Sequence, residues 1–80
     1  MKVEVYSTPT CPWCQKVKKF LEENQIQFTE KDVINNRENR LELVKKIKHL
    51  AVPVTVIDEN YENPIIGFDL KALTEKLKLP

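Results

Sequence analysis

The segment Cys11-Pro12-Trp13-Cys14 constrains this chain most, because it holds the only two cysteines. On the first turn of a helix, Cα atoms three residues apart lie about 5 Å from each other, within the roughly 4.4–6.8 Å that a disulfide tolerates. Proline favours the first helical position, so Pro12 places Cys11 at the N-cap. A thiolate there accepts free backbone N–H groups and lies at the positive end of the helix dipole. We therefore predict that Cys11 is the attacking thiol and Cys14 the resolving thiol.

Length and composition predict one small globular domain over residues 1–80. The chain is 41% apolar and 31% charged, which is typical of a folded protein. Its net charge of +1 does not indicate nucleic acid or an anionic membrane as a partner. No apolar run approaches about 18 residues, and the segment 1–4 lacks the apolar core of a signal peptide. We expect a cytoplasmic monomer, in which an isolated C-x-x-C indicates redox or metal chemistry.

Hydrophobic spacing in the first half of the chain predicts two strands and two helices. Lys2–Ser7 alternates as a strand does. A helix is predicted over residues 12–24, where the apolar residues Trp13, Val17, Phe20 and Leu21 fall at helical spacing. A second strand is indicated by Ile26, Phe28 and Val33.

Asn35 and Asn36, with Glu38 close behind, indicate the start of the second helix. This helix should bury an apolar stripe that consists of Leu41, Val44, Ile47 and Leu50 and is widened by Leu43.

The second half should hold two strands and a last helix. Val52–Ile57 is a dense β-branched run typical of a central strand, and Pro64–Ile66 is typical of an edge strand. The last helix should start near Asp69 and bury Leu70, Leu73 and Leu77. The order β-α-β-α-β-β-α predicts an α/β fold with one mixed four-stranded sheet and helices on both faces.

The cysteine pair has three interpretations from the residues alone: redox, metal-binding or structural. A structural zinc site needs four ligands, and the chain offers two cysteines and the distant His49, so we expect no metal site within one chain. His49 is more simply a favourable partner for a helix C-terminus. An iron–sulfur cluster shared between two chains remains an alternative of another class, as a carrier function.

Three segments together resemble the glutaredoxin family of the thioredoxin-fold superfamily over essentially the whole chain. They are Cys11-Pro12-Trp13-Cys14 after the first strand, Val52-Pro53 at the third strand, and Ile66-Gly67-Phe68-Asp69 before the last helix. The resemblance implies a thioredoxin fold, a cis peptide bond before Pro53, and glutathione as a co-substrate with no permanently bound cofactor.

The resemblance also implies a glutathione and substrate site. Its residues would be Thr8, Val52, Pro53, Gly67, Phe68 and Asp69. The chain departs from the family pattern at Ile66, where a glycine is common, and at Leu70, where an acidic residue often follows. A third departure is Thr8, where many relatives carry lysine.

We therefore expect a thiol–disulfide oxidoreductase that reduces protein disulfides and glutathione mixed disulfides, with the cysteine roles assigned above. By resemblance, an alternative is an electron donor to ribonucleotide reductase that thioredoxin reductase reduces. Some relatives carry selenocysteine at the position of Cys11. Trp13 should be partly exposed beside the cysteines, whereas Tyr6 could line the groove or face solvent.

Overall fold

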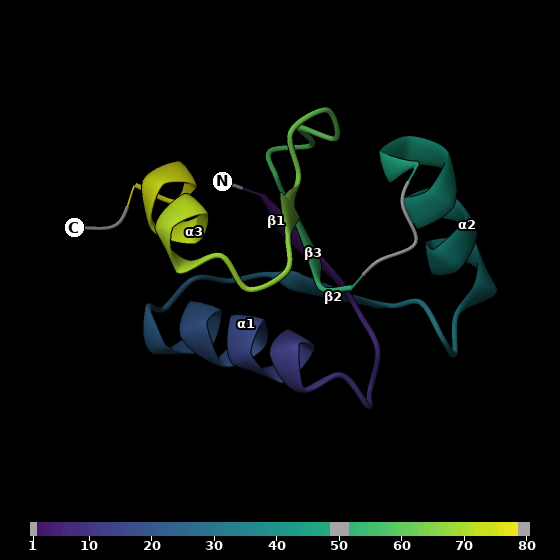
Figure 1. The fold of residues 1–80 in the computed structure, drawn as a ribbon, viewed down its shortest axis with the longest axis horizontal. Coiled ribbons are helices and arrows are strands. Elements are labelled where there is room, and N and C mark those ends of the chain that lie inside the picture. Colours follow the sequence, from purple (N-terminus) through teal and green to yellow (C-terminus); the bar gives the residue numbers. More distant parts are fainter. Residues whose placement is uncertain (1, 49–51, 79–80) are drawn as a thin grey trace.

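The computed structural model, which describes residues 2–48 and 52–78, contains one mixed four-stranded sheet (Figure 1). The strands are β1 (Val3–Ser7), β2 (Thr29–Asp32), β3 (Val54–Ile57) and β4 (Ile65–Ile66), in the spatial order β2-β1-β3-β4. β1 and β2 are parallel, and the pairs β1–β3 and β3–β4 are antiparallel. This arrangement confirms the α/β fold expected from the sequence, with β3 inside the sheet and β4 at its edge.

Three helices cover the two faces of the sheet (Figure 1). α1 (Pro12–Glu23) and α3 (Leu70–Lys76) lie on one face, and α2 (Arg37–Ile47) lies on the other. Each face has its own apolar cluster. The cluster under α1 and α3 contains Val3, Val5, Val17, Leu21, Ile65, Leu73 and Leu77, and that under α2 contains Tyr6, Val33, Leu43, Val54 and Val56. The side chains of β1 therefore alternate between two buried clusters.

The position of β2 differs from the expectation. Ile26 and Phe28 precede the strand and pack against the cluster under α1, and Val33 follows it. The strand itself has the polar sequence Thr-Glu-Lys-Asp. The position of this edge strand is determined by its pairing with β1, in which Val5 lies opposite Glu30. It is not determined by an alternation of apolar residues.

The buried faces of two helices also differ from the expectation. In α2, Leu43 is fully buried, whereas Leu41 and Val44 are exposed; Leu50 lies outside the described residues. Asn36 caps this helix by accepting the N–H of Asn39 at 3.1 Å, so Asn35 is not the cap and Glu38 is not its partner.

In α3, Leu73 and Leu77 are buried as expected, but Leu70 is 52% exposed. No helix among residues 2–48 and 52–78 is long and apolar enough to cross a membrane.

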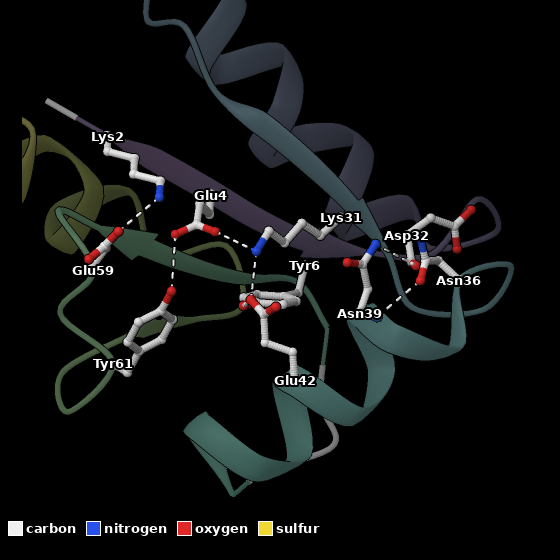
Figure 2. Close-up of polar contacts among 10 residues, drawn as sticks. All are labelled: Lys2, Glu4, Tyr6, Lys31, Asp32, Asn36, Asn39, Glu42, Glu59 and Tyr61. Atoms are coloured by element: carbon white, nitrogen blue, oxygen red, sulfur yellow. Dashed lines mark hydrogen bonds and ion pairs between the residues drawn. The ribbon is translucent and has the colours of Figure 1, made fainter.

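A partly buried ion network explains why α2 does not need a continuous apolar stripe (Figure 2). Lys31 of β2 lies between two carboxylates, with its Nζ 2.6 Å from Glu4 Oε2 and 2.6 Å from Glu42 Oε1. The Tyr6 hydroxyl donates to Glu42, and the Tyr61 hydroxyl donates to Glu4 at 3.3 Å. Glu4 is almost fully buried, and Lys31 and Tyr61 supply the partners that its carboxylate oxygens need there. The network thus joins α2 to the sheet through polar contacts.

We predict that Glu42→Gln destabilises the protein at neutral pH and weakens its sensitivity to acid. Hydrogen bonds from Lys31 and then Tyr6 hold the pKa of Glu42 below its ordinary value of 4.5. The stabilisation is therefore complete above the ordinary pKa and is lost as pH falls through the lowered folded value. Urea unfolding should show a loss of about 1–2 kcal/mol at pH 7 and a smaller further loss on acidification.

Exposed Glu62, in the β3–β4 turn, provides the matched control, since Glu62→Gln changes the same charge outside the network. If Glu42→Gln unfolded with the same pH dependence as Glu62→Gln, the network would not join α2 to the sheet as described.

Candidate active site

Cys11 lies at the N-cap of α1, as the C-P-x-C spacing predicts. Its backbone is extended, and its Sγ accepts the N–H of Cys14 at 3.3 Å. Pro12 occupies the first helical position, where no backbone donor is lost. The Cys11 side chain is partly exposed, so an incoming disulfide can reach the sulfur. The Cys11 sulfur is thus both accessible and held at the start of the helix by a backbone N–H.

Cys14, one turn further along α1, has a different environment. The residue is fully buried, and both cysteines are free thiols. Burial raises the pKa of the Cys14 thiol to about 11, and its hydrogen bond with Cys11 acts in the same direction. Cys14 is therefore protonated at neutral pH and shielded from solvent. The two sulfurs share one helical turn, yet only that of Cys11 is open to attack an external disulfide.

The Val52–Pro53 segment lies beside the segment that precedes α3. The Val52–Pro53 peptide bond is cis, and Pro53 is buried. The Gly67 N–H donates to the Pro53 carbonyl at 2.8 Å, and Ile66 pairs with Val54 across the sheet. Gly67 has a φ of +79°, which a side chain would strain. Glycine at this position therefore lets the chain leave β4 and turn back over the proline.

Trp13 and Phe68 join the redox motif to the same segment. Their rings stack with centroids 6.3 Å apart, and Phe20 contacts Phe68 edge-on at 6.4 Å. Trp13 remains 54% exposed, which confirms the expectation that it is not a core residue. The three segments that carried the family resemblance are thus linked in space, by the Trp13–Phe68 contact and by the Gly67–Pro53 hydrogen bond.

A cavity of about 230 Å³ lies on the α2 side of the motif. Thr8 and Val52 line it, together with Val33, Ile34 and Arg40. The first two were expected at the site, whereas Arg40 was not. A single arginine on an exposed helix carries no local sequence signal, and only the packing of α2 brings it to this cavity. Arg40 supplies a cation that can bind a carboxylate on the side where the chain has Thr8 instead of lysine.

Two other candidate residues have structural roles. Asp69 caps α3, since its carboxylate accepts the Ala72 N–H at 3.0 Å. Tyr6 neither lines a groove nor faces solvent: it is fully buried under α2 and donates to Glu42 (Figure 2). His49 lies outside the described residues. In the part of the chain that the structure describes, no three His, Cys, Asp or Glu side chains are grouped so that they could hold a metal ion.

We predict a large difference between the cysteines in alkylation by iodoacetamide at pH 7. Cys14→Ser, which retains Cys11, should react at least about 100-fold faster than Cys11→Ser, because the buried Cys14 thiol has a pKa of about 11 and forms little thiolate. Mass spectrometry of quenched samples measures both rates. In urea the two variants should react alike, and comparable rates in the folded proteins would contradict the assigned asymmetry.

Comparison with known proteins agrees with this geometry. The family model described as glutaredoxin matches residues 3–62, which include both cysteines and the cis-proline. A glutaredoxin-like 8.6 kDa protein from the rubredoxin operon of Clostridium pasteurianum, itself uncharacterized, is 41% identical over 94% of this chain and 95% of its own length. Glutaredoxin 3 of Escherichia coli is 32% identical over 74% of this chain and 71% of its own length.

Comparison with solved structures also indicates a glutaredoxin. The crystal structure of a glutaredoxin from Methanosarcina mazei superposes with a TM-score of 0.76 at 32% identity, over 95% of this chain and 77% of that protein. The likeness thus includes the sheet, the helices and the turn that carries the cysteines. This chain belongs to the glutaredoxin family of thioredoxin-fold thiol–disulfide oxidoreductases.

Proposed function

We propose that this protein reduces protein disulfides and glutathione mixed disulfides, with Cys11 as nucleophile, Cys14 as resolving thiol and glutathione as electron donor. The observation that carries the proposal is the contrast between the accessible N-cap sulfur of Cys11 and the buried thiol of Cys14. Only one of the two can start the reaction, and the other lies one turn away to finish it. Because the reaction starts from reduced thiols, it suits the reducing cytoplasm.

The exchange has two balanced steps. The Cys11 thiolate attacks one sulfur of a disulfide R–S–S–R′, which forms Cys11–S–S–R and releases R′–S⁻. Cys14 then loses its proton to a base such as the released thiolate and attacks the Cys11 sulfur. The Cys11–Cys14 disulfide forms, and R–S⁻ leaves. The substrate gains two electrons from the dithiol, and two glutathione molecules restore the dithiol as they are oxidised to glutathione disulfide.

The cavity beside Thr8 supports the glutathione part of the proposal. Glutathione carries two carboxylates at neutral pH, and Arg40 provides a cation on the cavity wall. Val52 lines the same cavity, and in the proposal its backbone pairs with the extended tripeptide. On the other side of the motif, Gly67 and Phe68 would border the peptide. The proposed glutathione and substrate site comprises Thr8, Val52, Pro53, Gly67 and Phe68, and Asp69 belongs to it as the residue that caps α3.

A second candidate is supported by the segment before α3. Ile66 is 46% exposed and Leu70 is 52% exposed, at positions where the family pattern has glycine and an acidic residue. Exposed apolar side chains suit contact with a protein better than contact with a small polar peptide. The second candidate is therefore a donor to ribonucleotide reductase that thioredoxin reductase reduces.

Two coupled assays distinguish the donors, one with glutathione and its reductase and one with thioredoxin reductase. We predict turnover with glutathione, no turnover of Cys11→Ser with either donor, and retained reduction of a glutathione mixed disulfide by Cys14→Ser. Arg40→Ala should raise the KM for the glutathione mixed disulfide about five- to tenfold, because a charge-assisted hydrogen bond contributes about 1.5–3 kcal/mol when buried and less at a solvated rim.

Arg37→Ala, at the exposed start of the same helix, is the matched control and should leave this KM unchanged. Turnover with thioredoxin reductase alone would replace the first candidate by the second. A visible absorbance band after anaerobic purification would instead indicate a cluster carrier, and a fully active Cys11→Ser would refute the nucleophile assignment.

A further inference from the structure

A second groove lies along α1 and shares no lining residue with the cavity that Arg40 lines. Two of its lining residues, Lys16 and Phe68, contact Trp13 of the cysteine motif. The groove has a volume of about 240 Å³, and its walls include Lys16, Lys19, Phe20 and Phe68. Residues 13, 16 and 20 follow one another at helical spacing, so the groove is continuous with Trp13, between the two cysteines. A molecule whose disulfide lies at Cys11 can therefore extend directly into this groove.

The groove combines an aromatic floor with a basic rim. Phe20 and Phe68 meet edge-on, and Phe68 stacks on Trp13, which is 54% exposed. The Lys16 Nζ lies 4.2 Å from the centroid of the Trp13 ring. This cation–π contact holds a positive charge over the ring of Trp13, which directly precedes Cys14. The aromatic rings offer a site for an apolar side chain of a bound molecule. The ammonium groups favour negatively charged groups next to that side chain.

The charge of the rim is unbalanced near the cysteines. Helix α1 has no acidic residue in its first turn. Lys18 is paired with Glu30. Lys16 and Lys19 line the groove and are exposed. The acidic residue that lines the groove is Glu23, one turn beyond Lys19. Two lysines against one glutamate leave the groove with a net charge of +1. Its surroundings therefore favour carboxylates and disfavour cations.

We propose that this groove is the docking site for an extended acidic segment of the disulfide-bearing partner protein, with an apolar side chain on Phe20 and Phe68 and carboxylates beside Lys16 and Lys19. The proposal rests on the proposed thiol–disulfide exchange and names the class of its protein substrate. Glutathione, by contrast, would lie along the Thr8–Val52–Arg40 side and reach only Gly67 and Phe68, at the end of the groove beside Trp13. The two sides of the motif thus serve a small donor and a protein acceptor.

The test uses three synthetic peptides, each with one intramolecular disulfide and a neighbouring phenylalanine flanked by two aspartates, two serines or two lysines. The reduced full-length protein should react fastest with the aspartate peptide and slowest with the lysine peptide. Lys19→Glu should lower the rate constant for the aspartate peptide about two- to fivefold, and Glu23→Lys should raise it by a similar factor, as expected for exposed charges worth up to about 1 kcal/mol each. Both effects should shrink in about 0.5 M salt.

Lys45→Glu makes the same charge change on α2, across the sheet, and should leave all peptide rates unchanged. Hydroxyethyl disulfide, which is small and neutral, should react at the same rate with every surface variant. Equal rates for the three peptides, or equal effects of Lys19→Glu and Lys45→Glu, would overturn the docking proposal while exchange itself persisted. If the wild-type protein did not react with hydroxyethyl disulfide, the proposed function itself would be overturned.

Discussion

The hydrogen bond from the Cys14 N–H to the Cys11 sulfur is the constraint on which the active site depends. It makes the Cys11 thiol the N-cap of α1. Cys11 is therefore fixed at the N-terminus of the helix, and the first helical turn places Cys14 in the core. The same turn therefore produces both the accessible sulfur of Cys11 and the shielded thiol of Cys14, whose pKa burial raises to about 11. Pro12 supports this geometry because it needs no hydrogen bond at the first helical position.

The rest of the fold supplies what surrounds that turn. The α1 side of the sheet carries the aromatic contact between Trp13 and Phe68, and the sheet edge brings Gly67 to Pro53. On the opposite face, the Glu4–Lys31–Glu42 network positions α2 (Figure 2). Helix α2 carries Arg40, which lines the same cavity as Thr8. The two sides of the motif are thus built by different layers of the protein. Under the two proposals above, this division gives a chain of 80 residues separate surfaces for two kinds of disulfide.

Local sequence rules predicted the elements that a few neighbouring residues are enough to indicate. The proline and cysteine spacing predicted the start of α1, the β-branched run predicted β3, and Asp69 was correctly placed as the start of α3. Apolar spacing failed for β2 and for the buried face of α2. Both are held to the sheet by polar contacts of Lys31, Glu42 and the β1 ladder, which hydrophobic periodicity does not register.

The same distinction applies to the candidate site. The cysteine roles and the cis-proline were expected from motif and family resemblance, whereas Arg40 and the Lys16–Phe68 groove were not. Their partners are distant in sequence, so only the packed sheet and helices reveal them. Tyr6 shows the converse: from the sequence it could line the groove or face solvent, whereas the network under α2 buries it.

The central claim is that external disulfides are attacked by Cys11 and never first by Cys14. The most direct measurement mixes the reduced wild-type protein with hydroxyethyl disulfide, quenches the reaction with acid at short times, and maps the mixed disulfide by mass spectrometry of peptides. The account predicts an early adduct on Cys11 that decays into the Cys11–Cys14 disulfide. An early adduct on Cys14, or equal amounts on both cysteines, would contradict it.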